Sequence, residues 1–145
     1  MGKVKTGKVN MRHLLNKREK GVARALDLKY TERFNARPKE DKDLIYHLGD
    51  SAKRMCWSAV SGKLPTLRMA GGILWVVRQN RILTAREKLA SLGFPVTPDV
   101  ANVMGVPELP LADVRRAAEV AGNAMHWGTV GVVQMVALSC FHSVV

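Results

Sequence analysis

The uncharged C-terminal run constrains the fold more than any other feature of this chain. From Val120 to Val145 the sequence contains no Lys, Arg, Asp or Glu. A run of this length can cross a membrane as a helix, but small and polar residues interrupt it and no basic residue follows it. The interrupting residues are Gly122, Asn123, His126, Gly128, Thr129, Gln134, Ser139 and His142. We therefore expect a helix buried within protein rather than a membrane anchor.

Positive charge is concentrated in the first half of the chain. Residues 1–68 contain 17 Lys and Arg against 7 Asp and Glu, whereas residues 69–145 contain 6 against 5. A basic segment joined to a nearly neutral one indicates a surface for a polyanion attached to a packed region. Nucleic acid is the commonest polyanion, although an anionic membrane surface or simple solubility gives the same composition. Hydrophobic residues make up 47% of the sequence, which excludes a wholly disordered chain.

The cysteines and histidines do not suggest a metal site. Cys56 and Cys140 are the only cysteines in the sequence, and their separation fits neither a disulfide scaffold nor a zinc motif. We expect both to be packed as small hydrophobic residues, and we expect no bound metal. The first residues are charged without an apolar stretch behind them, so we expect an intracellular protein without a secretory signal. The histidines follow no ligand or triad spacing, and they are His13, His47, His126 and His142.

The first half is expected to contain two helices and one strand. Apolar residues at helical spacing predict a basic helix over residues 11–34, with Gly21 as a point where it can break. Pro38 prevents its continuation. A short helix is predicted over residues 41–48, and a short strand over residues 57–60.

Basic side chains on the first predicted helix are candidates for binding the phosphates of a nucleic acid. They are Arg12, Lys17, Arg18, Lys20, Arg24, Lys29 and Arg33. The alternative interpretation is that they form a solvated helix face. Trp57 and Trp75 either stack on bases or belong to the core, and their apolar neighbours favour the core.

The middle of the chain has the pattern of a small hairpin or meander. Residues 64–68 are expected to be extended and residues 70–72 to turn. Residues 73–77 form a β-rich run, a turn follows at residues 79–80, and residues 81–83 form a second strand. Alternating turns and short apolar runs are typical of antiparallel strands.

The remaining residues have the start and stop signals of helices. Thr84 and Glu87 have the spacing of a capping box, and Gly93 supplies the left-handed residue that ends such a helix. Further helices are predicted to start near Pro98, to span residues 111–121 with an end at Gly122, and to run from His126 or Trp127 to Phe141. The fold class is therefore α+β, mostly helical with a small hairpin or meander.

Three strings in this half follow one another in a distinctive order. They are Arg81–Glu87, which reads Arg-Ile-Leu-Thr-Ala-Arg-Glu, then Gly93–Pro95, and finally Gly122–Ala124. In this order they resemble the closing motifs of the DNA cytosine-5 methyltransferases. The resemblance covers residues 63–145. The resemblance implies that these residues form the C-terminal part of such an enzyme without its Rossmann-like catalytic core. It also implies that residues 1–62, a basic arm and helices, can form part of a target-recognition region.

The resemblance also assigns a cofactor role to three residues. In this family the Gly-Asn-Ala segment lines the S-adenosyl-L-methionine pocket, so Gly122, Asn123 and Ala124 are the expected cofactor contacts. The alternative is that this segment is only a turn between two helices. Where the family continues with Val-Pro-Pro, this chain has Met125, His126 and Trp127, whose lack of proline leaves the start of the last helix less rigid.

The catalytic motifs of that family are missing from this sequence. Cys56 follows Met55 rather than a proline, no Glu-Asn-Val acid motif is present, and Gly71-Gly72 lacks the context of a nucleotide loop. The chain is therefore expected not to methylate DNA alone. The expected partners are DNA and a separate catalytic polypeptide, with S-adenosyl-L-methionine bound only in their presence, in the nucleus or nucleoid. The alternative function is a small basic nucleic-acid-binding protein without catalysis.

Overall fold

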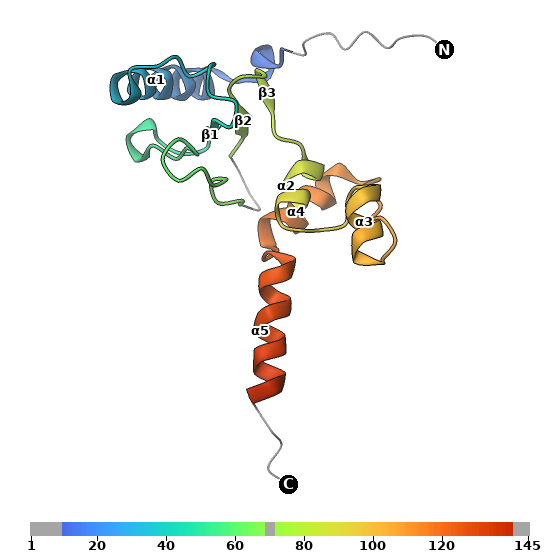
Figure 1. The fold of residues 1–145 in the computed structure, drawn as a ribbon. Coiled ribbons are helices and arrows are strands. Elements are labelled where there is room, and N and C mark those ends of the chain that lie inside the picture. The colour runs from blue at the N-terminus through green and yellow to red at the C-terminus, as the bar shows by residue number, and fades with distance from the viewer. Residues whose placement is uncertain (1–9, 69–71, 141–145) are drawn as a thin grey trace. The chain divides into compact units, whose positions relative to one another are not determined.

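The computed structural model describes residues 10–68 and 72–140. Within them lie five α-helices, two 3-10 turns and one small antiparallel sheet (Figure 1). This confirms the expected α+β class, mostly helical with a small sheet. In chain order the elements are η1 (Arg12–Leu14), α1 (Lys17–Phe34), β1 (Ile45–His47), η2 (Ala52–Arg54), β2 (Leu74–Val76), β3 (Arg81–Ile82), α2 (Ala85–Ser91), α3 (Pro98–Met104), α4 (Val114–Asn123) and α5 (Trp127–Cys140).

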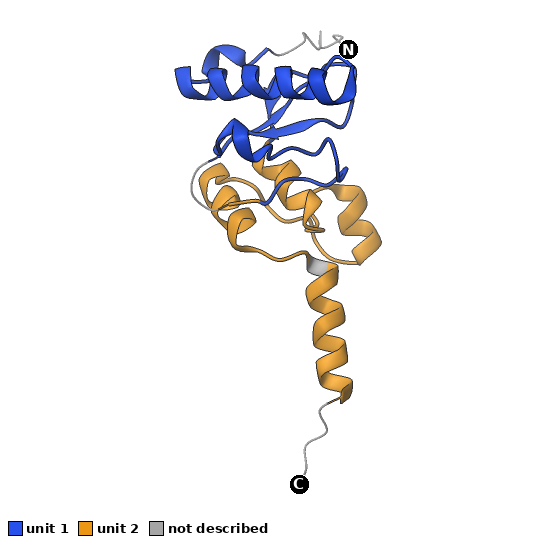
Figure 2. Ribbon diagram, turned by 90° about the vertical axis from the view of Figure 1, so that its left-hand side faces the viewer, with its two compact units in different colours: residues 1–66, 71–83 blue, residues 67–70, 84–145 orange. Residues whose placement is uncertain are grey.

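The chain forms two compact units, coloured separately in Figure 2. Unit 1 contains residues 1–66 and 71–83, and unit 2 contains residues 67–70 and 84–145. Strands β2 and β3 therefore belong with α1 rather than with the helices that follow them. The units do not coincide with the expected division after residue 62, which was drawn from the order of motifs.

Helix α1 confirms most of the helix predicted over residues 11–34. Its first turn is closed by a capping box, in which the Asn16 side chain accepts from the Glu19 amide and the Glu19 carboxylate accepts from the Asn16 amide, each at 2.9 Å. The helix ends at Asn35, which is left-handed with φ of 48°. Gly21 lies within the helix and does not break it.

The sheet of unit 1 corrects two predictions. Residues 41–48 contain strand β1 instead of a helix, because Leu44, Tyr46 and Leu48 are buried in the period of two that belongs to a strand. Residues 57–60 form a single bridge, from Trp57 to Tyr46, instead of a strand. The Ser58 hydroxyl accepts from the Ile45 amide at 2.9 Å, and the chain then turns. The predicted hairpin is confirmed as β2 and β3, with Trp75 opposite Ile82.

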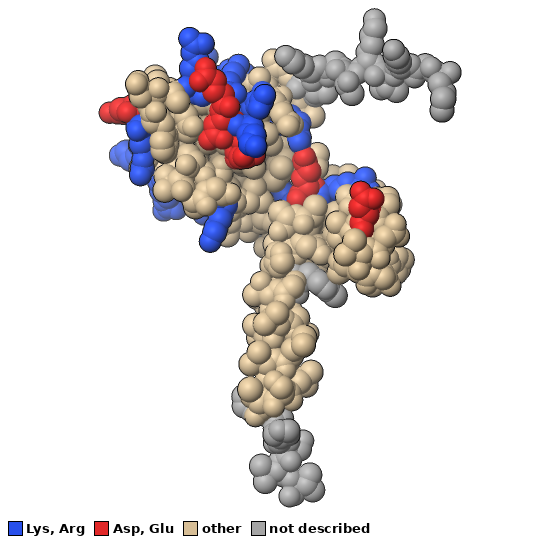
Figure 3. Space-filling model, in the orientation of Figure 1, with Lys and Arg blue, Asp and Glu red and all other residues tan. Residues whose placement is uncertain are grey.

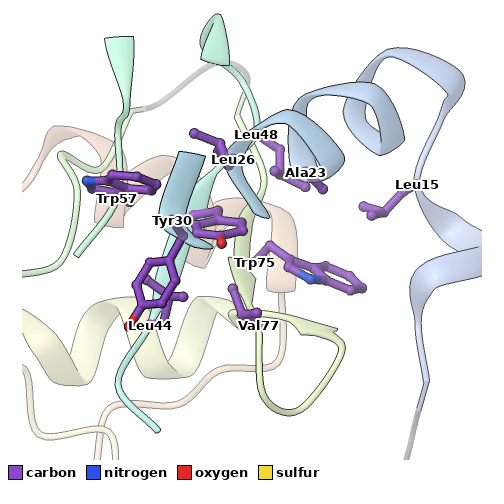
Figure 4. Packing of buried hydrophobic residues seen from close by; sticks show 10 residues of the cluster. Leu15, Ala23, Leu26, Tyr30, Leu44, Leu48, Trp57, Trp75 and Val77 are labelled. Carbon is purple, nitrogen blue, oxygen red and sulfur yellow. The ribbon is translucent and has the colours of Figure 1, made fainter. Parts of the chain in front are cut away.

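The core of unit 1 lies between α1 and the sheet, where side chains from both point toward one another (Figure 4). Trp57 and Trp75 are both buried in it, which agrees with the core alternative for these two tryptophans. The rings of Tyr30 and Trp57 meet edge to face with 6.0 Å between their centroids, a favourable arrangement for aromatic rings. The buried cluster consists of Leu15, Ala23, Leu26, Tyr30, Leu44, Tyr46, Leu48, Trp57, Trp75 and Val77.

Unit 2 begins with the predicted capping box. The Glu87 amide donates to the Thr84 hydroxyl at 3.2 Å, and the Thr84 amide donates to the Glu87 carboxylate at 2.9 Å. The predicted stop is also confirmed, since Gly93 has φ of 80°. Helix α3 begins as expected, with Thr97 at its N-cap and Pro98 in its first turn.

The last two helices correct three predictions. Helix α4 runs through Gly122 to Asn123, so Gly122 does not end it. Helix α5 has nearly the expected bounds but is exposed rather than buried, because no other described helix or strand packs along it. Cys140, in its last turn, is also exposed. None of the helices in the described residues is long and apolar enough to cross a membrane.

Candidate functional site

Two of the three strings behind the family resemblance lie at the ends of helices that pack against each other in unit 2, namely the start of α2 and the end of α4. Leu89 from α2 is buried against Ala117 and Ala121 from α4, together with Val96 from the loop between them. The helix that begins with the Thr84 cap therefore lies directly against the helix that carries the Gly-Asn-Ala segment. Small alanine side chains on α4 permit this close approach of the two helix backbones.

Arg86 connects α2 to the two loops beside it. Its Nε donates to the Val96 carbonyl at 2.7 Å, and its Nη2 donates to the Glu108 carboxylate. One guanidinium thus fastens residues on both sides of α3 to α2, a use of the planar group that lysine cannot reproduce. The sequence could not indicate these contacts, because no short-range pattern links Arg86 to Val96 or Glu108.

The three expected cofactor residues occupy the end of α4. Gly122 lies in the last turn and is half-buried, whereas Asn123 is the last residue of the helix and is exposed. Ala124 is the C-cap, and its amide donates to the Val120 carbonyl at 2.9 Å. The segment is therefore a helix end followed by an extended residue.

Asn123 and Ala124 line an open pocket of about 390 Å³, whose other walls are Arg116, Glu119 and Val120. Its volume lies within the range of small-molecule sites. Its polar groups are an amide that both donates and accepts, a guanidinium and a carboxylate. Such a set suits a polar or zwitterionic ligand. The pocket is open to solvent, so these residues can supply one wall of a binding site rather than an enclosed cavity.

The candidate phosphate-binding residues lie on two sides of α1 rather than in one stripe. Lys17, Lys20 and Arg24 are three and four residues apart and share one flank. Lys29 and Arg33 lie on the other flank, beyond the buried stripe that faces the core. Arg18 lies on the same flank as Lys29 and Arg33, which is called the second flank below, and Arg12 precedes α1 in η1.

Two members of the second flank have intramolecular partners. Arg18 donates from Nη2 to the Gly49 carbonyl at 2.6 Å. The guanidinium of Arg33 lies 5.7 Å from the ring centroid of Phe34, within the range of a cation–π contact. Within the described residues, no side-chain hydrogen bond or ion pair engages Lys17, Lys20 or Arg24, of which Lys17 and Arg24 are exposed and Lys20 is half-buried. The first flank is therefore better placed to meet an external anion.

The whole excess of positive charge belongs to unit 1. Its residues include 18 Lys and Arg against 7 Asp and Glu, whereas unit 2 contains five of each sign. In the face drawn in Figure 3, basic side chains are spread over unit 1 with acidic ones among them, while α5 shows no charge. A polyanion is therefore attracted to unit 1 and not to unit 2.

A polar cluster that sequence reasoning missed lies after β1. The buried carboxylate of Asp50 accepts from the Cys56 thiol at 3.3 Å. Its oxygens also lie 3.7 Å from Nδ1 of the buried His47 and 3.8 Å from the Arg54 guanidinium. Cys56 is thus a hydrogen-bonding group and not only a packed hydrophobic one. In the parts of the chain that the structure describes, no three His, Cys, Asp or Glu residues are grouped to hold a metal.

Comparisons with family models, with curated proteins and with solved structures found no match. The features that bear on function are therefore the packing of α2 against α4, the pocket beside Asn123 and the charge of unit 1.

Proposed function

We propose that this chain is the closing segment of a DNA cytosine-5 methyltransferase-like enzyme and is inactive alone. The observation that carries the proposal is the packing of α2 against α4. It joins the Thr84 capping box to the segment Gly122–Ala124 in one compact unit and leaves Asn123 exposed at its surface. The second part of the first string, Thr84–Glu87, and the last string thus lie in one compact unit, whereas Arg81–Leu83 belong to unit 1.

The pocket beside Asn123 suits a partial S-adenosyl-L-methionine site. The Asn123 amide would donate to and accept from the cofactor, and the Arg116 guanidinium would pair with its carboxylate. The cofactor supplies the methyl group in this chemistry. Because the pocket is open, the remaining walls would come from a catalytic polypeptide.

The cysteines of this chain are unsuited to the nucleophilic step. Cys56 belongs to unit 1, where its thiol donates to the buried Asp50 carboxylate, and it lacks the preceding proline of the family's nucleophile. Cys140 lies on an exposed apolar helix. The nucleophile, the acid and most of the cofactor site would therefore come from the partner, and DNA would be its substrate, in the nucleus or nucleoid.

The decisive experiment begins with the coding sequence that adjoins this one. We expect it to encode a glycine-rich loop, a Pro-Cys pair and a Glu-Asn-Val motif. Co-expression of that polypeptide with this chain should give transfer of tritiated methyl groups to DNA, and Asn123→Ala should raise the KM for S-adenosyl-L-methionine. Asn102→Ala, the same substitution at an exposed position of α3 outside the pocket, is the control. Absence of the motifs, or methylation indifferent to Asn123, would overturn the proposal.

A second candidate is a basic nucleic-acid-binding protein unrelated to methylation. The observation that favours it is the confinement of the net charge of +11 to unit 1. Filter binding of duplex DNA across a salt series should then show affinity that falls steeply with salt. In this case S-adenosyl-L-methionine would not change the affinity, and adjoining catalytic motifs would be absent.

A further inference from the structure

Helix α1 has a line of residues that faces away from the core of unit 1. Four exposed residues follow one another at intervals of four, three and four positions, which places them along one side of the helix. They are Lys17, Gly21, Arg24 and Leu28, and we call them the outer stripe. The buried residues of α1 lie on the opposite side, and they are Ala23, Leu26 and Tyr30. A partner that approaches α1 from solvent therefore meets the outer stripe.

Gly21 lies in the middle of the outer stripe, where nothing within the protein requires a glycine. Its φ is not positive, and a Cβ built on it would meet no atom of the described residues within 4 Å. Gly72 differs, since its φ is 108° and a Cβ there would collide with the His47 ring. Glycine in a helix interior is less favourable than alanine, because it loses more conformational freedom on folding. Gly21 therefore weakens α1 without a compensating contact inside the fold.

Cations lie on both sides of Gly21. Lys17 is about one turn before it and Arg24 about one turn after it, and Lys20 lies beside them on the same flank. In the described part of the chain, none of the three has a side-chain hydrogen bond or an ion pair. Lys17 and Arg24 are about 10 Å apart along the helix axis, and each strand of B-DNA carries a phosphate about every 3.4 Å of its axis. A strand along the outer stripe would thus present about three phosphates to three cations.

We propose that the outer stripe of α1 docks onto the sugar–phosphate backbone of duplex DNA, with Gly21 as the point of closest approach. The missing side chain lets the helix backbone come close to the strand, while the cations on either side pair with phosphates. Such contacts position the protein without reading base sequence. This inference rests on the second candidate function, the binding of nucleic acid by the basic unit 1, and it names the surface and the form of the partner.

The composition of the outer stripe favours a duplex over a single strand. Proteins that bind single strands stack the unpaired bases on exposed aromatic side chains. The outer stripe has no aromatic residue, and both Trp57 and Trp75 are buried in the core of unit 1. The stripe therefore offers charge and close approach, which suit a regular row of phosphates, and it offers no stacking surface for bases.

The position of Gly21 also favours DNA over an anionic membrane. A membrane surface attracts the same cations, but its lipid headgroups are mobile and can rearrange around an added side chain. The phosphates of a DNA strand are joined covalently at fixed spacing, so a side chain at Gly21 would hold the whole strand away from Lys17 and Arg24. Only a partner with fixed charges is sensitive to the absence of this one side chain.

The test measures stability and DNA affinity in the same variants of the full chain. Gly21→Ala and Gly21→Gln should each raise the Tm of unit 1 by about 4 °C, because both residues favour a helix. Both should nevertheless weaken binding to a short duplex, at least about threefold for alanine and about tenfold for glutamine, since the larger side chain causes the greater separation. Damage to α1 would instead lower stability and affinity together, so opposite changes identify a contact with the partner.

Gly131 provides the matched control in unit 2. It lies within α5, and a Cβ there also meets no atom of the described residues within 4 Å. Gly131→Ala should therefore favour its helix in the same way and leave the DNA affinity unchanged. Fluorescence anisotropy with a labelled duplex and with one of its separated strands gives the affinities, and we expect the duplex to bind more tightly. Circular dichroism gives the thermal transitions.

The possible failures of this inference and of the charge-based function are distinguishable. If replacing Lys17, Lys20 and Arg24 with glutamine weakens DNA binding but both Gly21 variants bind as the natural chain does, only the close approach at Gly21 is overturned. A natural chain that binds no duplex DNA would overturn both. Tighter binding to the single strand than to the duplex, or a preference for phosphatidylserine vesicles over the duplex, would overturn the inference by assigning the outer stripe to another partner.

Discussion

Units 1 and 2 differ in how completely each buries its own apolar residues. Unit 1 encloses a cluster that contains two tryptophans and two tyrosines between a helix and a sheet. Unit 2 buries mainly alanines and single aliphatic residues, and it leaves an apolar groove beside Leu89 and a whole helix exposed. The charge is divided in the opposite way, since unit 1 carries all of the excess. Unit 1 is therefore well enclosed and basic, and unit 2 is neutral and leaves more of its apolar surface exposed.

The same side-chain deletion in each unit tests this difference most strongly. Leu26 and Leu89 are both 1% exposed. Leu26→Ala should lower the free energy of unfolding by about 4–5 kcal/mol, because the enclosed core of unit 1 cannot close the cavity that the deletion leaves. Leu89→Ala should lower it by about 2–3 kcal/mol, because side chains and water beside the open groove can move into the space. Urea unfolding provides the measurement, followed by circular dichroism for both units and, in a Trp127→Phe background that leaves Trp57 and Trp75, by tryptophan fluorescence for unit 1. Equal losses would show that unit 2 is packed as tightly as unit 1.

Neutralising one flank of α1 tests the role of the charge. Replacing Lys17, Lys20 and Arg24 with glutamine should lower the affinity for duplex DNA at least about tenfold, and it should reduce the slope of log affinity against log salt by about 3. Filter binding from 50 to 300 mM salt measures both. The opposite-flank triple replacement of Arg18, Lys29 and Arg33 should have the smaller effect.

The control for this experiment comes from unit 2. Arg115 is highly exposed, and Arg115→Gln should change neither the affinity nor the slope, because the neutral unit does not attract the polyanion. If both triple variants bind DNA as the natural chain does, the charge of unit 1 serves another purpose.

The features that could be predicted from the sequence are those that a few neighbouring residues determine. The capping box at Thr84, the stop at Gly93 and the hairpin around Asn80 were predictable, because each is determined by a few neighbouring residues. The sequence predicts a helix where strand β1 lies, because Gly49 follows this segment as it would follow the end of a helix. Its alternation of buried side chains, including Tyr46, was the stronger signal.

The features that could not be predicted depend on residues that only the folded chain brings together. The bond from Cys56 to Asp50 forms only after η2 brings them together. The exposure of α5 follows from the absence of a packing partner in the described residues, which no apolar pattern reveals. Asn123 was placed by motif order, and its exposure at a helix end depends on where α4 stops. The sequence predicts surfaces that need burial, but not what buries them.

Removing the N-cap side chain of one helix in each unit compares the two units at the level of single hydrogen bonds. Asn16→Ala and Thr84→Ala each remove the same type of capping box, and each should lower stability by about 1 kcal/mol. Helix α2 has 7 residues and α1 has 18, so a larger fraction of α2 is lost when its first turn frays. We therefore expect amide exchange to accelerate throughout α2 but only in the first turn of α1. Uniform acceleration along both helices would contradict this expectation.

Asp27 provides the smallest and most specific test of unit 1. Burial raises the pKa of this carboxyl above its ordinary 3.8, and the hydrogen bond from the Tyr46 hydroxyl, at 3.1 Å, only partly opposes the rise. The folded chain therefore keeps this proton at a pH where the unfolded chain has lost it. As a result, the contribution of Asp27 to stability falls as pH rises from 3.8 through the raised pKa.

Asp27→Asn keeps an oxygen that accepts from Tyr46 and removes the titration. We expect the variant to be as stable as the natural chain at pH 4 and more stable at pH 7, by less than about 1 kcal/mol. Urea midpoints measured across this range provide the test, with Glu32→Gln at an exposed position of α1 as the control. A variant that is less stable than the natural chain at pH 7 would show that the attraction of Arg12 and Lys39 for the Asp27 charge outweighs its burial. Basic residues of unit 1 would then stabilise the fold as well as attract a polyanion.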